Sequence, residues 1–298
     1  MKVSVIIPSY NSASTLMKTL TELLRQTAVE KIREIIVVDS STDGDTPRMI
    51  SELFRDTIVR GVHAGVLVMP AVARNIGARE AEGDLLLFID ADAFPALDWV
   101  EKILAAREQG ILSGGGSIDI PDFQKNRVLP LAQFFIQFNE YTPHRVKEKK
   151  PFSPSCNLFC DKELFERVNG FPEIRASEDV LFGHEVSRLT DYWFLPEARV
   201  YHIFRESWTS FFKNMRLLGK YIFVYRKFAN ESLWYLKGSW PVFLAPFFAF
   251  LKWFFLTGRV VAAGPGYALR YLISLPAVLA GMINWAMGFS EGVLSEKF

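Results

Sequence analysis

The stretch Asp84-Leu85-Leu86-Leu87-Phe88-Ile89-Asp90-Ala91-Asp92 decides the fold. A continuous apolar run of this length, bounded by acids, is typical of a strand that is buried on both faces. Such strands occur in sheets that are covered by helices on both sides, and ligands bind beyond the carboxyl ends of their strands. The two acids that end this run therefore lie where a site is expected.

Apolar runs of the same kind alternate with segments of helical periodicity in the preceding and following chain. The segment 14–26, for example, places Leu16, Leu20, Leu23 and Leu24 at helical spacing. This alternation predicts an α/β fold with a Rossmann-like, mainly parallel sheet flanked by helices. The expected strands are 3–8, 34–39, 57–62, 84–90 and 111–118, and the expected helices are 14–26, 46–54, 70–81 and 97–107.

The composition excludes several classes of protein. The 298 residues include 34 Lys and Arg against 33 Asp and Glu, a net charge of +1, which argues against a basic nucleic-acid-binding protein and against a highly charged disordered chain. The two cysteines, Cys156 and Cys160, make no disulfide scaffold and give a poor zinc signal, and we interpret both as buried small residues. The run 114–116, all glycine, fits a flexible strand end rather than a phosphate loop.

The C-terminal part of the chain is apolar in a different way. Residues 238–257 and 264–290 hold one charge each, Lys252 and Arg270, and each segment is long enough to cross a bilayer as a helix. We therefore expect a membrane-associated helical hairpin over 238–298. Two alternatives remain open: helices that lie in the membrane interface, and an apolar helical subdomain or dimer interface of a soluble protein.

Residues 205–237 mix basic and aromatic side chains ahead of the first apolar segment. The stretch 205–227 holds six Lys and Arg and a single acid, Glu206. This pattern predicts amphipathic juxtamembrane helices that contact anionic lipid, with a solvated helix face as the alternative. The positive-inside rule then places residues 1–230 in the cytoplasm, with the catalytic domain facing the cytoplasmic membrane. The predicted domains are 1–204, 205–237 and 238–298.

Two acids at the end of the central strand form a candidate metal site. Asp90 and Asp92 are separated by one residue, so strand alternation puts both carboxylates on one side. Hard oxygen ligands suit Mg²⁺ or Mn²⁺, which often bind together with substrate phosphates. Acids also end strands without any ligand, so this pattern alone leaves a structural role open. His202, at the end of another expected strand, is either a third metal ligand, a diphosphate contact or a packed histidine.

Three other positions carry chemistry. Asp39 ends the strand 34–39, where a carboxylate can accept hydrogen bonds from a base or ribose, although turn and cap roles also fit. Arg74 offers a planar fork for phosphate or a base carbonyl, although a lone arginine is more often on the surface. Glu178 and Asp179 begin a helical run, where one of them serves as a general base or both stabilise the helix terminus.

Taken together, these segments resemble the inverting glycosyltransferases of family 2, which have the GT-A fold. The resemblance extends from residue 3 to about residue 205, in the family's order, through the segments 5–11, 36–44, 73–77, 88–92, 170–172 and 177–179. The run Asp39-Ser40-Ser41 is less acidic than the frequent Asp-Asp-Gly-Ser version, which leaves the nucleotide base open with a preference for uridine. The Gln-x-x-Arg-Trp motif of processive synthases does not occur, which favours transfer of a single sugar.

The resemblance implies a role for each matching residue. The catalytic base would be Asp179, the acid that follows Glu178. The implied contacts to the nucleotide-sugar donor are Pro8, Ser9, Tyr10, Asp39, Arg74 and Asp90. The implied ligands of Mg²⁺ or Mn²⁺ are Asp92, Asp90 and His202.

The expected function is metal-dependent, inverting transfer of one sugar from a nucleotide-sugar donor, preferably a UDP-sugar, to a lipid-linked or glycan acceptor. No nucleic-acid partner is expected. One alternative is a polyprenyl-phosphate glycosyltransferase that makes a lipid-phosphate sugar. The other belongs to a different class, the nucleotidyltransferases that form sugar nucleotides, but these carry a glycine-rich phosphate loop after the first strand, which Ser9-Tyr10-Asn11-Ser12 does not supply.

Overall fold

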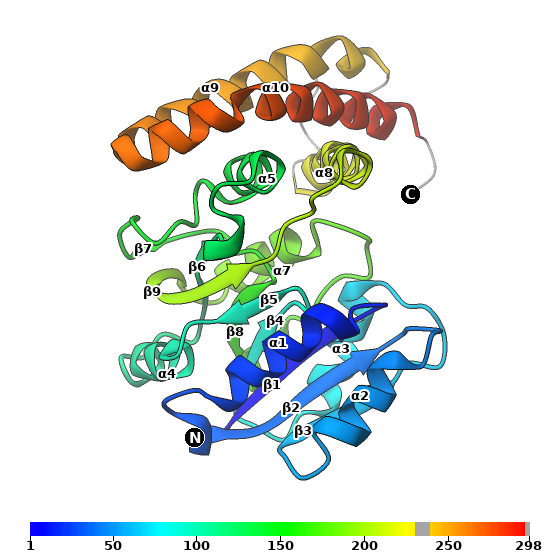
Figure 1. Ribbon diagram of the computed structural model, residues 1–298, viewed down its shortest axis with the longest axis vertical. Helices are drawn as coiled ribbons and strands as arrows, with labels where there is room; N and C mark the ends of the chain where they lie inside the picture. Colours follow the sequence, from blue (N-terminus) through cyan, green and yellow to red (C-terminus); the bar gives the residue numbers. More distant parts are fainter. Residues whose placement is uncertain (230–238, 296–298) are drawn as a thin grey trace. The chain divides into compact units, whose positions relative to one another are not determined.

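A computed structural model describes residues 1–229 and 239–295, and it describes side chains throughout these ranges except 223–229. The chain forms two compact units (Figure 1). The first unit comprises residues 1–119 and 143–202, and the second comprises residues 120–142 and 203–298. Residues 120–142, for which the sequence pattern gave no separate role, therefore group with the C-terminal segment.

The first unit contains a mixed, nine-stranded sheet in the order β3-β2-β1-β4-β8-β6-β9-β5, with β7 paired to β9. Strands β3, β2, β1 and β4 run parallel, as expected, whereas β8 is antiparallel to both of its neighbours. Strands β5 and β7 are antiparallel to β9, and β9 is parallel to β6. The strands are β1 (Val3–Ser9), β2 (Ile32–Asp39), β3 (Val59–His63), β4 (Leu85–Ile89), β5 (Ala93–Pro95), β6 (Ser113–Asp119), β7 (Glu148–Lys149), β8 (Asn157–Asp161) and β9 (Tyr192–His202).

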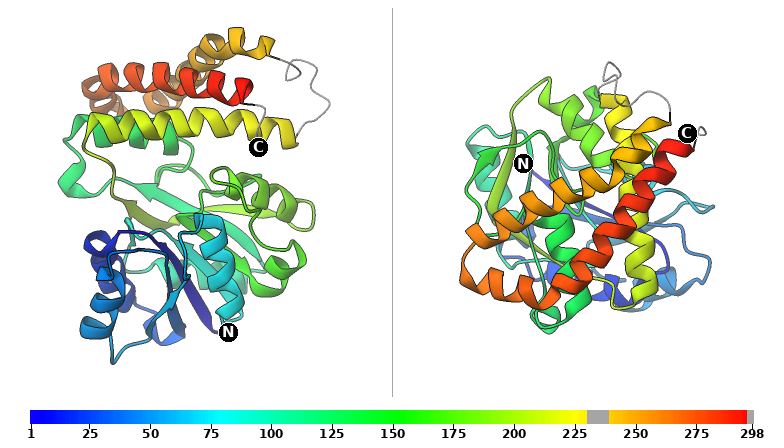
Figure 2. Two further views of the ribbon diagram at one scale, coloured as in Figure 1. Left: turned by 90° about the vertical axis from the view of Figure 1, so that its right-hand side faces the viewer. Right: turned by 90° about the horizontal axis from the view of Figure 1, so that it is seen from above.

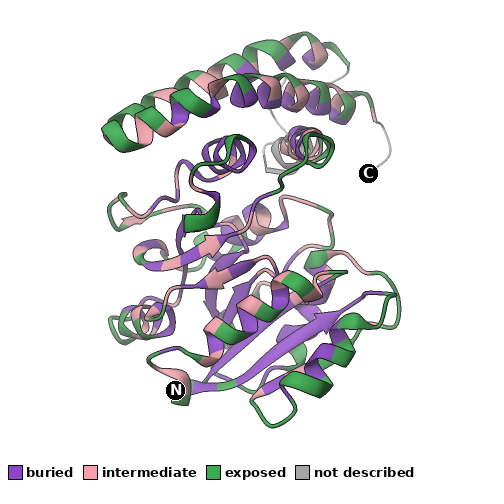
Figure 3. Ribbon diagram, viewed as in Figure 1, coloured by how far each residue is buried: buried purple, intermediate pink, exposed green. Residues whose placement is uncertain are grey.

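Helices cover both faces of this sheet, so its central strands are buried (Figure 3). Alternation divides β1 between two cores: Val3, Val5 and Ile7 face one of them, and Ile6 faces the other. Leucines at helical spacing on α1 pack into the first core, and small residues of α3 pack into the second. The helices are α1 (Ala13–Leu24), α2 (Asp45–Leu53), α3 (Pro70–Glu80), α4 (Trp99–Glu108), α6 (Lys162–Arg167) and α7 (Glu178–Ser187), with a short 3₁₀ turn at Val29–Lys31. A second 3₁₀ turn, Asp122–Gln124, belongs to the second unit.

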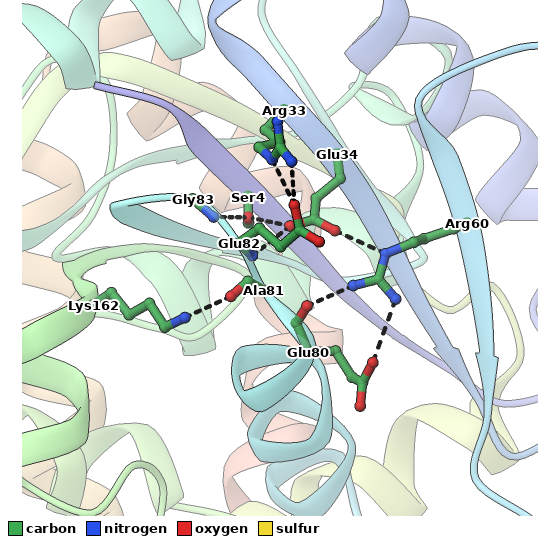
Figure 4. Close-up of polar contacts among 9 residues, drawn as sticks. All are labelled: Ser4, Arg33, Glu34, Arg60, Glu80, Ala81, Glu82, Gly83 and Lys162. Carbon is green, nitrogen blue, oxygen red and sulfur yellow. Dashed lines mark hydrogen bonds and ion pairs between the residues drawn. The ribbon is translucent and has the colours of Figure 1, made fainter.

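A polar network fixes the amino end of β2, at the edge opposite the carboxyl ends of the parallel strands (Figure 4). The Glu34 carboxylate accepts hydrogen bonds from Ser4 Oγ at 2.7 Å, Arg60 Nε at 2.7 Å and the Glu82 backbone N–H at 2.6 Å. These donors hold the pKa of Glu34 below its ordinary value, although burial opposes them. This cluster is saturated by protein groups and has a structural role.

The glycine run lies inside β6 and not at a flexible strand end, which corrects that expectation. A Cβ at Gly116 would overlap the carbonyl oxygen of Ala198 and lie 2.6 Å from Asn157 Nδ2. A Cβ at Gly115 would lie 2.5 Å from the Asn157 carbonyl oxygen. The glycines therefore permit close approach of β6 to its two neighbouring strands.

The second unit contains four helices in the part of the chain that is described: α5 (Val128–Phe138), α8 (Trp208–Ala229), α9 (Ala245–Ala262) and α10 (Pro265–Leu294). A 3₁₀ segment, Trp240–Leu244, leads into α9. By length and composition, 240–262 and 265–294 are apolar enough to cross a membrane. The helices α9 and α10 lie side by side (Figure 2). Of the expected juxtamembrane segment 205–237, α8 covers 208–229, and the remainder from 230 onward lies outside the described residues.

Glycines and aromatic rings join α10 to α5 and α8. A Cβ at Gly281 of α10 would lie 2.7 Å from Phe211 Cζ and 2.8 Å from Ile136 Cδ1. Gly288 and Gly292 face the backbone of α8 at Arg216 and Lys220. At the other end of α10, the Tyr271 ring packs edge-on against Phe135, with 5.5 Å between centroids. One side of α10 is thus packed against protein along most of its length.

Candidate active site

The carboxyl ends of β1 and β4 border a cleft in the first unit. Six of the residues that the sequence singled out line it: Pro8, Ser9, Tyr10, Arg74, Asp90 and Asp92. The side of the cleft beyond β2 is formed by Ser40 and by the start of α3. The chain therefore brings these candidates together at the sheet edge where α/β proteins bind ligands.

Asp39 lies behind this cleft and is not among its lining residues. Its side chain is buried, and Oδ1 accepts a hydrogen bond from Ser41 Oγ at 2.7 Å. The same hydroxyl accepts one from the Asn11 backbone N–H, also at 2.7 Å. The other carboxylate oxygen, Oδ2, is buried and has no hydrogen-bond partner within residues 1–229 and 239–295. An unsatisfied buried acceptor at a strand end suits a polar ligand.

Arg74 is the centre of the charged cluster, which corrects the expectation that an isolated arginine is a surface residue. Its side chain is 3% exposed, on α3, a helix that begins with Pro70 at its first position. Nη2 donates to Asp90 Oδ1 at 2.6 Å, and Nη1 donates to Glu178 Oε1 at 2.8 Å. These two carboxylates raise the pKa of the guanidinium against the effect of burial. The fork therefore joins an acid at the end of β4 to an acid of α7.

Glu178 and Asp179 occupy the first turn of α7, after Ser177 in the left-handed conformation with φ 68°. The Asp179 carboxylate accepts backbone hydrogen bonds from Ser155 at 3.1 Å and from Val180 at 2.8 Å. Burial raises the pKa of Asp179, and burial together with the Asp179 charge raises the pKa of Glu178 to about 7. Both acids also lie where the helix dipole favours negative charge, which fits stabilisation of the helix terminus, and the catalytic role stays a prediction.

The two acids are therefore not equivalent. Glu178 is committed to Arg74, whereas the hydrogen bonds recorded for Asp179 come from backbone N–H groups. Asp179 lies outside the set of cleft-lining residues, but its charge acts on both Arg74 and Cys156. The raised pKa makes Asp179 a stronger base than an ordinary aspartate.

A group of metal-ligand types lies beside the cleft. The Nε2 atom of His202, at the end of β9, is 3.6 Å from Asp92 Oδ1. One ligand atom each from Asp90, Cys156 and His202 lie within 4.8 Å of one another. Asp90, Asp92 and His202 are the three ligands that the sequence nominated, and Cys156 is an addition. Its position before β8 carries no signal in the sequence, because β8 itself was not predicted.

Comparisons with known proteins agree with this arrangement. The sequence model of glycosyl transferase family 2 matches residues 4–168. Glycosyltransferase AglE of Haloferax volcanii is 28% identical over 199 residues, which cover 63% of this chain and 61% of AglE. A validoxylamine A glucosyltransferase of Streptomyces hygroscopicus subsp. jinggangensis is 40% identical over 106 residues, or 35% of this chain and 25% of that protein. The chain thus spans less than two thirds of the length of these relatives.

Solved structures support the fold. The mannosyltransferase PcManGT from Pyrobaculum calidifontis, in complex with GDP-Man and Mn²⁺, superposes with a TM-score of 0.61 at 19% identity, covering 99% of this chain and 88% of that one. GalNAc-T7 with UDP, GalNAc and Mn²⁺ gives 0.55 at 18% identity, covering 68% and 43%. The GT-A expectation is therefore confirmed for the fold. Since the family model covers more than half of the chain and every motif that lines the cleft, this protein belongs to glycosyl transferase family 2.

Proposed function

We propose that this protein is a metal-dependent, inverting glycosyltransferase that moves one sugar from a nucleotide-sugar donor to an acceptor at the cytoplasmic face of a membrane. The observation that carries the proposal is the double contact of Arg74 with Asp90 and Glu178. Through this contact Arg74 connects Asp90, on the donor side of the site, with Glu178. Glu178 is the neighbour in sequence of Asp179, the proposed catalytic base. Family membership favours sugar transfer over the nucleotidyl transfer that was the alternative.

The donor would lie along the ends of β1 and β2. Asp39, with one unsatisfied buried oxygen, would accept a hydrogen bond from the base, and Pro8, Ser9 and Tyr10 would line the pocket. We propose a UDP-sugar and treat a GDP-sugar as the competing donor. Both nucleotides occur in the structurally similar proteins, as UDP in GalNAc-T7 and as GDP-Man in PcManGT.

The residues present fit a divalent cation. Two carboxylates and an imidazole, from Asp90, Asp92 and His202, make a donor set that accepts Mn²⁺ readily and Mg²⁺ through its oxygens. The bound ion would supply positive charge that offsets the charge developing on the leaving diphosphate. Arg74 would add to that positive charge, because its guanidinium is 2.6 Å from Asp90.

The chain's own groups would carry out the proton transfer. Asp179 would take the proton of the acceptor hydroxyl as that oxygen attacks the anomeric carbon and the nucleoside diphosphate leaves on the opposite side. Attack with a single base on one face inverts the anomeric configuration. Glu178 would hold Arg74 in place, and the backbone N–H groups of Ser155 and Val180 would hold the Asp179 carboxylate in position.

The acceptor is proposed to be lipid-linked or a glycan, because two long apolar helices follow the family 2 segment. A polyprenyl-phosphate acceptor would arrive already ionised, so Asp179 would then have no proton to remove. The two acceptor types therefore differ in their need for Asp179. The Asp179→Asn variant should keep full turnover with a polyprenyl phosphate acceptor and lose it with a hydroxyl acceptor. Its turnover with the natural acceptor would therefore show whether that acceptor needs a catalytic base.

We further propose that α9 and α10 lie in the membrane interface and do not cross the bilayer. Arg259, one turn before the end of α9, pairs with Glu140 at 2.8 Å and donates to Asn139 Oδ1 at 3.2 Å. Near the C-terminal end of α10, Glu291 pairs with Arg216 of α8 at 3.5 Å. The end of α9 and the C-terminal end of α10 thus both lie beside charged residues of the same unit. A hairpin with its turn on the far side of a bilayer would separate these two places.

The exposed face of these helices suits lipid. Its large apolar side chains are more than half exposed in each case: Phe243, Phe247, Phe250, Phe254, Phe255, Val261, Leu269, Leu272, Ile273, Ile283 and Leu294. Much of α9 and α10 is exposed (Figure 3), and only 22% of the apolar window in 240–262 and 44% of that in 265–294 is buried. A helix with one face packed on protein and an apolar face open is typical of in-plane membrane binding.

A labelling experiment separates the two membrane arrangements. The variant Ala262→Cys places a thiol at the exposed end of α9, and both native cysteines are buried. In sealed inside-out vesicles, an impermeant thiol reagent should modify this position, which would share a side with residues 1–202. Labelling only in right-side-out vesicles or intact cells would mean that the hairpin spans the bilayer. A full-length chain that does not sediment with membranes would refute both arrangements.

The transferase proposal is tested by thermal shifts with UDP, GDP, UMP and GMP, each with and without Mn²⁺. A diphosphate should raise the melting temperature only when Mn²⁺ is present, and Asp92→Ala should abolish that increase. Slow hydrolysis of a matching nucleotide sugar in the presence of Mn²⁺ should accompany it. If no nucleoside diphosphate stabilises the chain in any of these conditions, the proposal fails.

A further inference from the structure

We infer that Cys156 is a direct thiolate ligand of the divalent cation and gives the site a preference for transition-metal ions over Mg²⁺. This inference rests on the proposed metal dependence, and it goes beyond it because the resemblance to family 2 placed no role on a cysteine. It begins from the three ligand types that Asp90, Cys156 and His202 bring together.

The distances among the three side chains are close to those that one shared ion requires. Their ligand atoms lie within 4.8 Å of one another. With metal–ligand distances of about 2.0–2.3 Å for nitrogen, oxygen and sulfur, two ligands of the same ion are at most roughly 4.6 Å apart. A pair at the 4.8 Å limit would therefore approach slightly when an ion binds. The three groups come from segments far apart in sequence: the end of β4, the turn before β8 and the end of β9.

The Cys156 thiol is buried beside Asp90 and His202, and neither of the two cores of the first unit described above includes it. Cys156 is 3% exposed, and burial together with the charges of Asp90, Asp92 and Asp179 raises the pKa of its thiol well above the ordinary value. A cation bound beside it would supply the positive charge that favours the thiolate. By contrast, Cys160 packs into the core formed by α3, α6 and β4 residues such as Leu86, Phe88 and Leu164. An apolar packing role thus describes Cys160 well and Cys156 poorly.

The neighbouring residue fixes the backbone that carries Cys156. Asn157 is buried, and its Oδ1 accepts a hydrogen bond from Trp99 Nε1 at 2.9 Å. Its Nδ2 donates to the carbonyl oxygens of Ser117 at 2.8 Å and Ala198 at 2.9 Å. These bonds tie the start of β8 to β6, β9 and α4, so the thiol is held in place before a cation arrives, as supporting residues do in metal sites.

The chemistry of sulfur explains the preference. A thiolate is a soft ligand that favours zinc-like and other transition-metal ions, whereas Mg²⁺ prefers oxygen ligands and binds sulfur weakly. When the sulfur–metal bond forms, the thiol proton passes to solvent. With Cys156 as a ligand, Co²⁺, Mn²⁺ or Cd²⁺ should bind in clear preference to Mg²⁺. Without it, the remaining oxygen and imidazole ligands should discriminate less.

Absorption spectroscopy tests this inference without any need for turnover. Full-length protein is titrated with Co²⁺ and with Cd²⁺, in the presence of UDP and separately of GDP. The thiolate-to-metal charge-transfer band, in the near-ultraviolet for Co²⁺ and at shorter wavelength for Cd²⁺, is recorded as a difference from the same protein and nucleotide without the metal. Cys160→Ser is the matched control, because it leaves Cys156 as the one thiol in the sequence. Wild type and Cys160→Ser should both show the band, and Cys156→Ser and Cys156→Ala should lose it. The ratio of Cd²⁺ to Mg²⁺ affinity should fall by about tenfold or more in both Cys156 variants.

The remaining outcomes contradict the inference in distinguishable ways. If Co²⁺ or Cd²⁺ binds wild type without a thiolate band, Cys156 is no ligand, and the metal dependence proposed above is unaffected. If the band survives in Cys156→Ser but disappears in Cys160→Ser, the ligand is Cys160 and the inference is wrong. If neither metal binds with any nucleotide, both the inference and the proposed metal dependence fail. Should both Cys156 variants fail to fold, the band in Cys160→Ser still decides the question.

Discussion

Arg74 Nη1 lies 2.8 Å from Glu178 Oε1, and this contact joins two segments that are 104 residues apart. The second arm of the same guanidinium reaches Asp90 Oδ1 at 2.6 Å. Because the arginine is 3% exposed and Glu178 is 9% exposed, water contributes little to screening either charge. The stability of this region should therefore depend strongly on the arginine.

The first prediction is that Arg74→Met lowers the free energy of unfolding by about 3–5 kcal/mol, because it leaves the buried Glu178 carboxylate and the partly exposed Asp90 carboxylate without their cation. Arg74→Lys should recover little of this loss, since a single ammonium cannot span the two acids as the planar fork does. Urea denaturation followed by circular dichroism measures both variants. Arg188→Met, which breaks an exposed pair with Glu185 on the same helix as Glu178, should change stability by less than about 1 kcal/mol. Equal losses for Arg74→Met and Arg188→Met would contradict the argument.

The second prediction concerns the pH dependence of stability and compares two glutamates. Burial raises the pKa of Glu178 from its ordinary 4.5 to about 7, so between these pH values the folded chain holds a proton that the unfolded chain has lost. The contribution of Glu178 is fully present below pH 4.5 and is lost as the pH rises through about 7. Glu178→Gln should therefore gain stability relative to wild type, by about 1–3 kcal/mol, between acidic and weakly alkaline pH.

Glu34 has the opposite sign and serves as the comparison. Its pKa is lowered, so its contribution is present above the ordinary value of 4.5 and is lost as the pH falls through the lowered pKa. Glu34→Gln should be less stable than wild type near neutral pH, and the difference should shrink in acid. Urea midpoints for both variants across this range provide the measurement. If the two variants respond to pH in the same direction, the environments assigned to these carboxyl groups are wrong.

Local sequence pattern predicted the parallel half of the fold and the acids that follow it. The apolar runs of β1, β2 and β4 are buried on both faces, and a strand of this kind has a recognisable composition. A carboxyl group at the end of such a strand must lie at one edge of the sheet. Asp90 and Asp92 could be placed there without any knowledge of the remaining chain.

The other half of the site depends on contacts that no local pattern encodes. Strand β8 is short and antiparallel, and it reaches the centre of the sheet only because β4 and β6 accept it there. The position of Cys156 follows from that pairing. The burial of Arg74 likewise depends on an acid 104 residues away. For Cys156 and Arg74 the sequence shows which chemical groups are present, but it does not show which distant residues those groups contact.

The third prediction tests the close approach of β6 to β9. Gly116→Ala should destabilise the fold by about 3 kcal/mol or more, because the new Cβ would overlap the carbonyl oxygen of Ala198 and the surrounding strands leave no room to shift. It should also weaken metal and nucleotide binding, since Asn157 Nδ2 lies 2.6 Å from the added carbon. Gly258→Ala is the matched control: a Cβ there meets no atom within 4 Å, and alanine favours the helix by about 1 kcal/mol. A Gly116→Ala variant as stable as wild type would show that β6 is not packed as described.

The fourth prediction separates the two acids of α7 by their roles. Asp179→Asn should reduce kcat with a hydroxyl acceptor by about 10²–10⁴-fold, because the amide cannot take the proton, while Kd for the nucleotide stays within a few fold. Glu178→Gln keeps a hydrogen-bond acceptor for Arg74, so its turnover should fall much less than that of Asp179→Asn. Glu185→Gln, on the exposed side of α7, controls for changes in the helix itself. Rates are measured over a range of pH. Because the proposed base has a raised pKa, the wild-type rate should fall in acid at a pH above the ordinary pKa of an aspartate. If Glu178→Gln loses as much turnover as Asp179→Asn and the acidic limb disappears with Glu178, then Glu178 is the base, and Asp179 supports the helix terminus.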